Sequence, residues 1–377
     1  MARRILITGG AGFIGSYVAE EMLERGYAVR ALDSLAPQVH GAERRVPAYL
    51  SRDIELVRGD VRDRDVVDRA LRDVEGVIHL AAAVGVGQSM YAVEHYTSVN
   101  NIGTAVLMEV LAQRKVQRLV VASSMSVYGE GLLRAQSGKA AVSSRRSRSQ
   151  LAAGRWELHD EDDGTLEPVA TPESKAVDLS SVYALSKYDQ ERLCLMLGEA
   201  YGIPAIALRF FNVYGPRQAL SNPYTGVLAI FAARLLNDMP PLIFEDGLQR
   251  RDFVSVHDVA RACRLAYEHP TAEGAVLNIG SGQPRTILEI SAAMGKVMNK
   301  DIEPEITGEY RVGDIRHCFA DIARAREVLG YMPHVRFEEG LEELAQWLEG
   351  QTAIDRVAQA HHELAARGLT FGEGRRA

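Results

Sequence analysis

TGGAGFIG, residues 8–15, follows the short apolar run Ile5–Ile7 and precedes a longer amphipathic stretch. Its Gly10, Gly12 and Gly15 have the spacing G-x-G-x-x-G, and the flanking patterns predict a strand over 5–7 and a helix over 13–25. Glycine suits these places because one allows a tight turn, one lets the backbone approach a pyrophosphate, and one lets the helix pack closely on the strand. Amide groups at the start of the helix would hold the negative charge. The stretch therefore predicts a dinucleotide-binding turn.

Short apolar runs continue to alternate with amphipathic segments beyond this turn. Further strands are predicted over 28–32, 54–57, 77–80, 119–122, 203–209 and 275–279, and further helices over 66–71, 102–111 and 181–201. Apolar strands that alternate with helices predict a parallel sheet covered on both faces. The fold class is therefore α/β, a doubly wound parallel Rossmann sheet with a smaller C-terminal α/β substrate lobe.

The weaker periodicity of two regions sets the expected domain limits. We expect a Rossmann domain over 1–214, a mainly substrate-binding lobe over 215–345 from which 253–282 returns to the Rossmann domain, and a helical tail over 346–377. The Ser-, Arg- and acid-rich stretch 131–178 is predicted to be an insertion in the first domain. Because long structureless loops are uncommon in compact domains, we expect it to cover a neighbouring site or form a small subdomain.

Composition excludes several classes of protein. The net charge of −7 over 377 residues argues against nucleic-acid binding, and the basic run Arg145–Arg148 is predicted to be a solvated loop. No stretch approaches the roughly 18 apolar residues of a membrane helix. The three cysteines have no metal or disulfide spacing, and the histidines lack ligand spacing for a metal. We therefore expect a cytoplasmic protein with no metal and no membrane partner.

Asp33 ends the second predicted strand, about twenty residues after the glycine turn, where a dinucleotide site needs an acidic residue. Its carboxylate would accept hydrogen bonds from the adenosine ribose and would repel a 2′-phosphate, which favours NAD over NADP. A turn cap is the alternative. Asp60 and Val61 follow the third strand, where adenine would lie. Ala81–Ala83 end the fourth strand and could pass close to the cofactor, although ordinary tight packing explains small residues there as well.

Tyr183 and Lys187 stand four residues apart on one face of the predicted helix 181–201. A nearby ammonium favours a phenolate and lowers the pKa of the phenol, so the pair can act as a general base near neutral pH. Ser124, at the end of a predicted strand, supplies a hydroxyl for the same substrate oxygen. These three residues are the predicted catalytic group.

Ten segments in this order resemble the extended short-chain dehydrogenase/reductase family and, within it, the nucleotide-sugar 4-epimerases. They are TGGAGFIGS, LDSL, GDVRD, HLAA, SSMSVYG, YALSK, LRFFNVYGPRQ, RDFVSVHDVA, NIGSG and GDIRH, between residue 2 and about residue 345. The resemblance implies that Tyr183 is the acid/base, Lys187 its electrostatic partner and a ribose contact, and Ser124 the catalytic hydroxyl. It also implies a homodimer built from the helices near 102–111 and 181–201.

The fingerprint and the resemblance together give two sets of expected ligand contacts. The cofactor-binding residues are Gly9, Gly12, Phe13, Ile14, Gly15, Asp33, Asp60, Val61, Leu80, Ala81, Ala82, Ala83, Asn100, Tyr183 and Lys187. The substrate-binding residues are Val84, Ser124, Met125, Ser126, Asn212, Leu242, Phe244, Arg251, Arg311 and Asp314. By the resemblance, Asn212 meets the substrate phosphate, Arg251 and Arg311 clamp the diphosphate, Asp314 holds the nucleotide ribose, and 242–244 lie beside the base. Guanidinium groups suit the clamp because they bind phosphate in a bidentate manner.

Departures from the family patterns refine the expected reaction. Met125 and Ser126 stand where the family's dehydratases carry an Asp-Glu pair and its decarboxylases a Glu, which disfavours elimination. Val84 replaces a lysine usual in galactose-type epimerases, and the insertion is absent from plain epimerases. We therefore expect NAD-dependent epimerisation at C4 of a UDP-hexose or a TDP-6-deoxysugar such as TDP-rhamnose, through a 4-keto intermediate. A 4,6-dehydratase or 4-ketoreductase and a non-catalytic NAD-sensing protein remain the alternatives.

Overall fold

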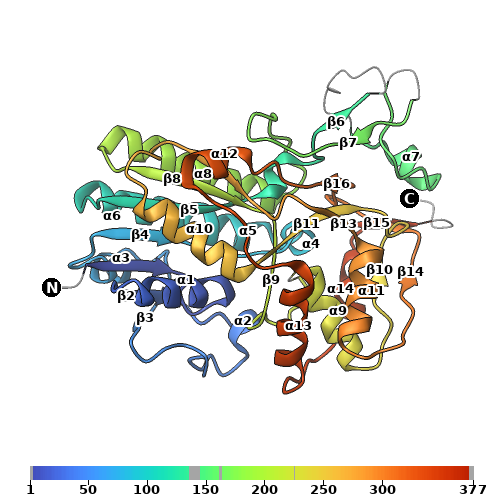
Figure 1. The fold of residues 1–377 in the computed structure, drawn as a ribbon, viewed down its shortest axis with the longest axis horizontal. Coiled ribbons are helices and arrows are strands. Elements are labelled where there is room, and N and C mark those ends of the chain that lie inside the picture. The colour runs from blue at the N-terminus through green and yellow to red at the C-terminus, as the bar shows by residue number, and fades with distance from the viewer. Residues whose placement is uncertain (1–2, 136–144, 161–163, 225, 373–377) are drawn as a thin grey trace.

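Seven parallel strands form the central sheet, in the order β12-β8-β5-β4-β1-β2-β3. The computed structural model describes residues 3–135, 145–160, 164–224 and 226–372 (Figure 1). The strands are β1 (Arg4–Thr8), β2 (Ala28–Asp33), β3 (Glu55–Arg58), β4 (Gly76–His79), β5 (Arg118–Ser124), β8 (Ala205–Phe210) and β12 (Val276–Ile279). The predicted strands agree with these bounds to within two residues, and the doubly wound α/β class is confirmed.

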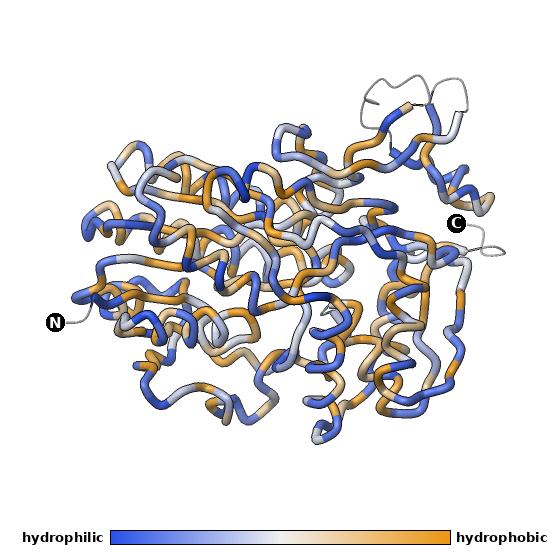
Figure 2. The backbone as a smooth tube through the Cα atoms, in the orientation of Figure 1, coloured by the Kyte–Doolittle hydropathy of each residue, from blue (hydrophilic) through white to orange (hydrophobic). Residues whose placement is uncertain are grey.

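Helices cover both faces of this sheet because alternate strand residues point to opposite sides. Ile5 and Ile7 of β1 join a core cluster with α1 (Phe13–Glu24), α10 (Val256–Glu268) and α12 (Ala323–Leu329), whereas Leu6 joins a second cluster with α3 (Arg64–Ala70), α6 (Gly103–Gln113) and α8 (Val182–Tyr201). Figure 2 shows hydrophobic stretches along the central strands and hydrophilic segments in the surrounding loops.

The crossovers of the sheet carry short additional elements. They are α2 (Pro37–His40), α4 (Val86–Ser89), α5 (Val93–Tyr96), a π-helical turn (Thr97–Ile102) and a 3-10 turn (Met125–Tyr128). The π-helical turn leads directly into α6, so the chain between β4 and α6 stays close to the carboxyl ends of the central strands. This is the edge at which ligands bind in open α/β sheets.

A second lobe packs beside that edge. Its core cluster joins α9 (Val227–Leu236), α11 (Ile287–Val297) and α13 (Phe337–Leu348). Its strands are β9 (Asn212–Tyr214), β10 (Leu242–Ile243), β11 (Arg250–Ser255), β13 (Pro284–Thr286), β14 (Glu305–Ile306), β15 (Glu309–Arg311) and β16 (His317–Cys318). β11 pairs with β9, β13 and β16, whereas α10 and β12 lie with the central sheet.

The insertion contains a small structured unit. β6 (Leu133–Arg134) pairs antiparallel with β7 (Glu167–Pro168), α7 spans Arg148–Ala152, and Leu133, Leu158 and Leu166 form a separate hydrophobic cluster. Residues 136–144 and 161–163 of the insertion lie outside the described residues.

The prediction of a solvated basic run is wrong for Arg146. Its side chain is only 5% exposed and forms ion pairs with Glu130 (3.4 Å) and Glu245 (2.7 Å). Arg145 remains exposed and pairs with Asp178. Buried charges require such partners, and the partners of Arg146 come from distant parts of the chain that a local charge pattern does not reveal.

The C-terminal tail is only partly helical, which corrects the prediction for 346–377. α13 ends at Leu348, and α14 spans Val357–Ala365. β17 (Thr370–Gly372) then pairs antiparallel with β15, and the rings of Tyr310 and Phe371 stack at 5.3 Å. The last described residues therefore lie on the second lobe.

The described part of the chain contains neither a membrane-spanning helix nor a cluster of metal-binding side chains. None of its helices is long and apolar enough to cross a membrane. The described residues also contain no group of three His, Cys, Asp or Glu side chains arranged to hold a metal ion.

A buried ion pair fastens α8 to the sheet. The carboxylate of Glu191 on α8 accepts hydrogen bonds from Arg209 Nε (2.9 Å) and Nη2 (2.7 Å) on β8 and from Ser123 Oγ (2.7 Å) on β5. Glu191 and Arg209 are 1% and 5% exposed. Because water cannot replace a lost partner here, the pair sets the position of α8 firmly.

Replacing Glu191 with alanine leaves the guanidinium of Arg209 buried without its partner. We expect the Glu191→Ala variant to lose about 3–5 kcal/mol of unfolding free energy. The measurement is urea denaturation followed by circular dichroism. The matched control is Glu109→Ala, which removes the exposed Arg64–Glu109 pair and should change stability by less than about 1 kcal/mol. Equal losses in the two variants would contradict the role of the buried pair.

Candidate active site

The glycine turn brings three backbone segments into contact. A Cβ on Gly15 would overlap the carbonyl oxygen of Gly9, and a Cβ on Gly10 would lie 2.7 Å from that of Ala31. Gly9 has a φ of +71°, a conformation in which residues with a side chain are strained. A Cβ on Gly9 would also lie only 3.0 Å from the backbone nitrogen of Ala81. Gly12 is the N-cap of α1 and provides no side-chain cap, so the amides of the first helical turn are not capped by a side chain, which fits a pyrophosphate there.

Asp33 braces this turn from the end of β2. Its Oδ2 accepts a hydrogen bond from the amide of Ala11 (3.0 Å), and its Oδ1 accepts one from the amide of Leu35 (2.8 Å). Each carboxylate oxygen has a second lone pair, so the bracing role and the predicted ribose contact are compatible. The carboxylate and the open amides together fit NAD.

The other predicted cofactor residues lie at the same edge of the sheet. The guanidinium of Arg62 donates a hydrogen bond to Asp60 Oδ2 (2.6 Å), which lowers the pKa of Asp60. Val61 packs against Gly103, because a Cβ on that glycine would lie only 2.6 Å from the Val61 side chain. Ala81 receives support from Thr8, whose Oγ1 accepts its amide hydrogen at 3.2 Å. Contacts of Asp60 and Val61 with adenine stay a prediction.

Asn100 connects the segment after β4 to α8. It is fully buried, its Oδ1 accepts from the amide of Ala83 (2.7 Å), and its Nδ2 donates to the Ala83 carbonyl (3.1 Å) and Ser186 Oγ (2.8 Å). Asn100 therefore positions this segment against α8, and its contact with the cofactor stays a prediction.

Ser124 and Tyr183 meet at the carboxyl end of β5. Tyr183 lies in the first turn of α8, which Ser181 caps by accepting the amide hydrogen of Ala184 (3.1 Å). Ser124 Oγ accepts hydrogen bonds from the amide (3.2 Å) and the hydroxyl (2.9 Å) of Ser126 and also interacts with the hydroxyl of Tyr183. The structure thus places Ser124 and Tyr183 in contact, as the sequence predicts.

The electrostatics of Tyr183 differ from the expectation. Burial raises the pKa of Tyr183, and the hydrogen bond with Ser124 opposes that rise. Lys187 Nζ donates to Gln190 Oε1 at 2.7 Å, and burial lowers the pKa of this lysine to about 8. The prediction that Lys187 lowers the phenol pKa is therefore wrong for this arrangement, because burial dominates and Ser124 supplies the compensating hydrogen bond.

A cavity of about 270 Å³ lies between the sheet edge and the second lobe and reaches Met125 and Ser126, which follow Ser124. Eight of the predicted substrate residues line it: Met125, Ser126, Asn212, Leu242, Phe244, Arg251, Arg311 and Asp314. The other two, Val84 and Ser124, do not line it; Ser124 contacts the lining residue Ser126 at 2.9 Å, and Val84 is exposed. The amide oxygens Asn212 Oδ1 and Gln249 Oε1 are buried at the cavity without a hydrogen-bond partner in the described structure. Such orphaned acceptors indicate a polar ligand.

Two arginines give the cavity a cationic wall. Arg251 donates to the backbone carbonyls of Arg250 (3.0 Å), Arg316 (2.9 Å) and Ile315, which leaves two of a guanidinium's five N–H groups for a ligand. Arg311 Nε donates to Asp314 Oδ2 at 2.9 Å, and its guanidinium lies 4.6 Å above the ring of Phe244. Both groups suit a diphosphate.

Several lining residues carry no recognisable sequence signal. They include Tyr224, Gln249 and four residues of the C-terminal helix, Val357, Ala360, His361 and Leu364. Each belongs to a segment with no family motif, and only the packing of the second lobe places it at the cavity.

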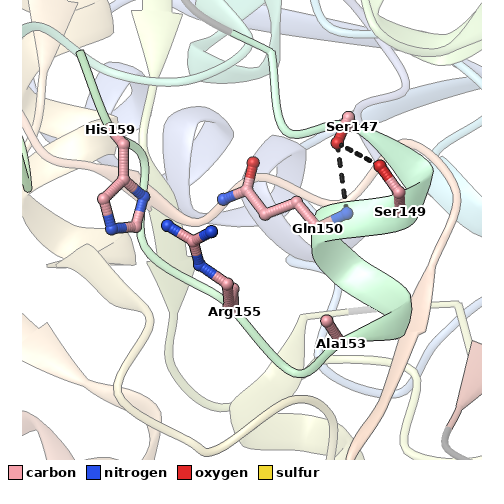
Figure 3. Close-up of a pocket in the computed structure, with 6 residues that line it drawn as sticks. All are labelled: Ser147, Ser149, Gln150, Ala153, Arg155 and His159. Carbon is pink, nitrogen blue, oxygen red and sulfur yellow. Dashed lines mark hydrogen bonds between the residues drawn. The ribbon is translucent and has the colours of Figure 1, made fainter. Parts of the chain in front are cut away.

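The insertion has a hollow of its own, drawn in Figure 3. It is lined by Ser147, Ser149, Gln150, Ala153, Arg155 and His159. Ser147 caps α7 there by accepting the amide hydrogen of Gln150 at 3.1 Å. None of the predicted site residues lines this hollow. The candidate active site is therefore the cavity between the sheet edge and the second lobe.

Comparison with known proteins agrees with this geometry. The model of the NAD dependent epimerase/dehydratase family matches residues 5–153 and 160–280. A dTDP-L-rhamnose 4-epimerase of Burkholderia thailandensis is 35% identical over 351 residues, covering 92% of this chain and 95% of that protein. A putative UDP-glucose 4-epimerase of Methanocaldococcus jannaschii is 31% identical, covering 92% and 98%. A solved structure, the UDP-glucose 4-epimerase of Thermus thermophilus in complex with NAD, matches with a TM-score of 0.73 and 30% identity, covering 93% and 100%.

The family match spans the glycine turn, Ser124 and the Tyr183–Lys187 pair, so the resemblance found in the sequence is confirmed. Its breadth also disfavours a non-catalytic protein, since the catalytic group is intact within it. The chain belongs to the NAD dependent epimerase/dehydratase family and is an enzyme that uses NAD as its cofactor.

Proposed function

We propose that this enzyme epimerises C4 of a nucleoside-diphosphate sugar, with a TDP-linked 6-deoxyhexose such as TDP-rhamnose as the favoured substrate and a UDP-hexose as the second candidate. The observation that carries the proposal is the cavity that extends from Met125 and Ser126, next to the Ser124–Tyr183 pair, to the arginine wall of Arg251 and Arg311. A sugar at the first end and a diphosphate at the second would fill it.

The protein's part in this reaction is to move one proton and to hold the diphosphate. Tyr183 as phenolate removes the proton of the C4 hydroxyl, while Ser124 binds the same oxygen. NAD, when bound, supplies the chemistry that takes a hydride from C4 and returns it. The sugar then turns about its link to the diphosphate, which Arg251 and Arg311 keep fixed, and Tyr183 returns the proton to the oxygen of the epimer.

The residues around Ser124 disfavour the alternative eliminations. Met125 and Ser126 are buried and uncharged, and the hydroxyl of Ser126 donates to Ser124. A dehydratase needs a group that takes the C5 proton, and neither side chain can supply a carboxylate there. The absence of a carboxylate at these two positions supports epimerisation, a reaction that keeps the C5 proton and all sugar atoms.

The shape of the catalytic end favours a 6-deoxysugar. Val86, Gly87, Met125 and Leu364 are apolar lining residues from α4, the end of β5 and α14, whereas the lining arginines and carboxylates lie in β11 and β15 or shortly after β10 and β15. A methyl group at C5 gains by burial among apolar side chains, and a charged carboxylate loses. The 35% identity to a dTDP-L-rhamnose 4-epimerase supports the same choice.

The direct test is incubation of the purified protein, without added cofactor, with TDP-rhamnose, UDP-glucose and UDP-glucuronic acid. We expect a C4 epimer of unchanged mass from TDP-rhamnose, identified by chromatography and proton NMR. A product lighter by one water would favour a dehydratase. A rise in absorbance at 340 nm that requires added NAD⁺ would favour a 4-ketoreductase, which oxidises these C4 alcohols in its reverse direction and forms free NADH. A preference for UDP-glucose would retain epimerisation and replace the proposed sugar.

The pH dependence tests the roles of Ser124 and Tyr183. Because the hydrogen bond with Ser124 lowers the raised pKa of Tyr183, Ser124→Ala should raise it further. The phenolate then forms only at higher pH. We expect the acidic limb of the kcat/KM profile to move to higher pH and kcat to fall about 100-fold at neutral pH. Tyr183→Phe should abolish turnover and retain NAD, and Ser149→Ala, on the surface of α7, should behave as wild type. An unshifted limb in Ser124→Ala would contradict the assignment.

We also propose a homodimer through α6 and α8. Ile102, which precedes α6, and Leu185 and Met196 of α8 are 52%, 53% and 52% exposed, although all are large and apolar. A second copy of this surface would bury them.

Sedimentation tests this dimer. Wild type should sediment with twice the chain mass, and Met196→Glu should shift the protein toward the monomer because a buried carboxylate would be unpaired. Val39→Glu, on α2, is the control and should remain dimeric. A monomeric wild type would refute the proposal.

A further inference from the structure

The C-terminal helix α14 forms one wall of the substrate cavity. Val357, Ala360, His361 and Leu364 line it, and β17 then pairs antiparallel with β15. The helix is also tied down by polar contacts: Glu363 accepts hydrogen bonds from the hydroxyls of Tyr91 (2.9 Å) and Tyr224 (3.2 Å). These contacts hold α14 in place as a wall of the cavity.

The wall has an apolar end and a polar end. Leu364 lies on the catalytic side, because a Cβ on Gly87 of α4 would be 3.4 Å from its Cδ1. His361 is three residues earlier, on the same face of the helix and one turn away. Its ring centroid is 5.8 Å from that of Phe244, the aromatic ring over which Arg311 lies. His361 thus faces the end of the cavity where the diphosphate and nucleoside would lie.

A neighbouring carboxylate orients the ring of His361. Its Nε2 lies 2.6 Å from Oε2 of Glu309 on β15, two residues before Arg311, and the histidine side chain is 29% exposed. A carboxylate accepts, so Nε2 carries the proton of this hydrogen bond. Nδ1 is then the atom that can accept from a ligand, or donate to it if the ring is protonated.

We propose that His361 is a substrate-binding residue that hydrogen-bonds the nucleoside half of the substrate beside Phe244, with Glu309 as its positioning residue. This inference rests on the proposed function. It assigns part of the recognition of the nucleotide to the tail of the chain, outside the family match over 5–280.

The experiment measures nucleotide binding without turnover. TDP and UDP are titrated calorimetrically into the NAD-loaded full chain, and cofactor content and circular dichroism are recorded for each variant. We expect His361→Ala to weaken the binding of the preferred nucleoside diphosphate about 10-fold, the loss of one hydrogen bond to a polar ligand. Glu309→Gln should weaken it several-fold, because the ring loses its orientation. His362→Ala is the matched control, since this exposed neighbour on α14 faces away from the cavity, and it should bind as wild type.

The outcomes separate the inference from the proposed function. If wild type binds TDP or UDP and His361→Ala and Glu309→Gln bind them equally well, the inference is overturned and the proposed function stands. If wild type binds neither nucleotide, the proposed function fails and the inference fails with it. Should His361→Ala not fold, Glu309→Gln alone decides, with the KM of the epimerase reaction rising while kcat stays unchanged.

Discussion

The close approach of β1, α1 and the end of β4 is the constraint on which the site depends. Gly9, Gly10 and Gly15 have no room for a Cβ, because the backbone of the turn, Ala31 or Ala81 occupies that space. The N-cap of α1 is Gly12, so no side chain caps the amides of its first turn, and the carboxylate of Asp33 holds the glycine turn through the amide of Ala11 and its own loop through the amide of Leu35. The cofactor surface is thus formed mainly by backbone, which leaves side chains free to vary elsewhere.

The catalytic pair depends on a second rigid connection. α8 carries Tyr183 at its start and Glu191 in its middle, and the buried pair of Glu191 with Arg209 fixes the helix to β8 while Ser123 ties the same carboxylate to β5. Ser124 is the next residue along β5. One carboxylate therefore sets the register between the strand that carries the serine and the helix that carries the tyrosine, and a small slip would separate the two hydroxyls.

The sequence was sufficient for those parts of the molecule that local patterns control. The parallel sheet follows from alternating apolar runs, and the glycine turn and the Tyr183–Lys187 spacing follow from local geometry. Arg146 and His361 could not be found in that way, because their partners Glu245 and Glu309 lie 99 and 52 residues away. The pKa of Tyr183 was also misjudged, since the burial that raises it, against the opposing hydrogen bond with Ser124, exists only in the folded chain.

These long-range contacts concentrate around the polar half of the cavity. Arg316, which is fully buried, pairs with Glu157 of the insertion (2.5 Å) and with Glu245 (3.0 Å), and Arg146 reaches Glu245 and the carbonyl of Asp314. Burying so many charges costs free energy that well-packed apolar residues would not, so the network serves the arrangement that it fixes and not stability alone. Since Glu245 and Asp314 line the cavity, the insertion helps to shape its polar wall. Under the proposed function, chemistry resides in the Rossmann domain, whereas recognition is shared by the insertion, the second lobe and α14, which meet only in the folded protein.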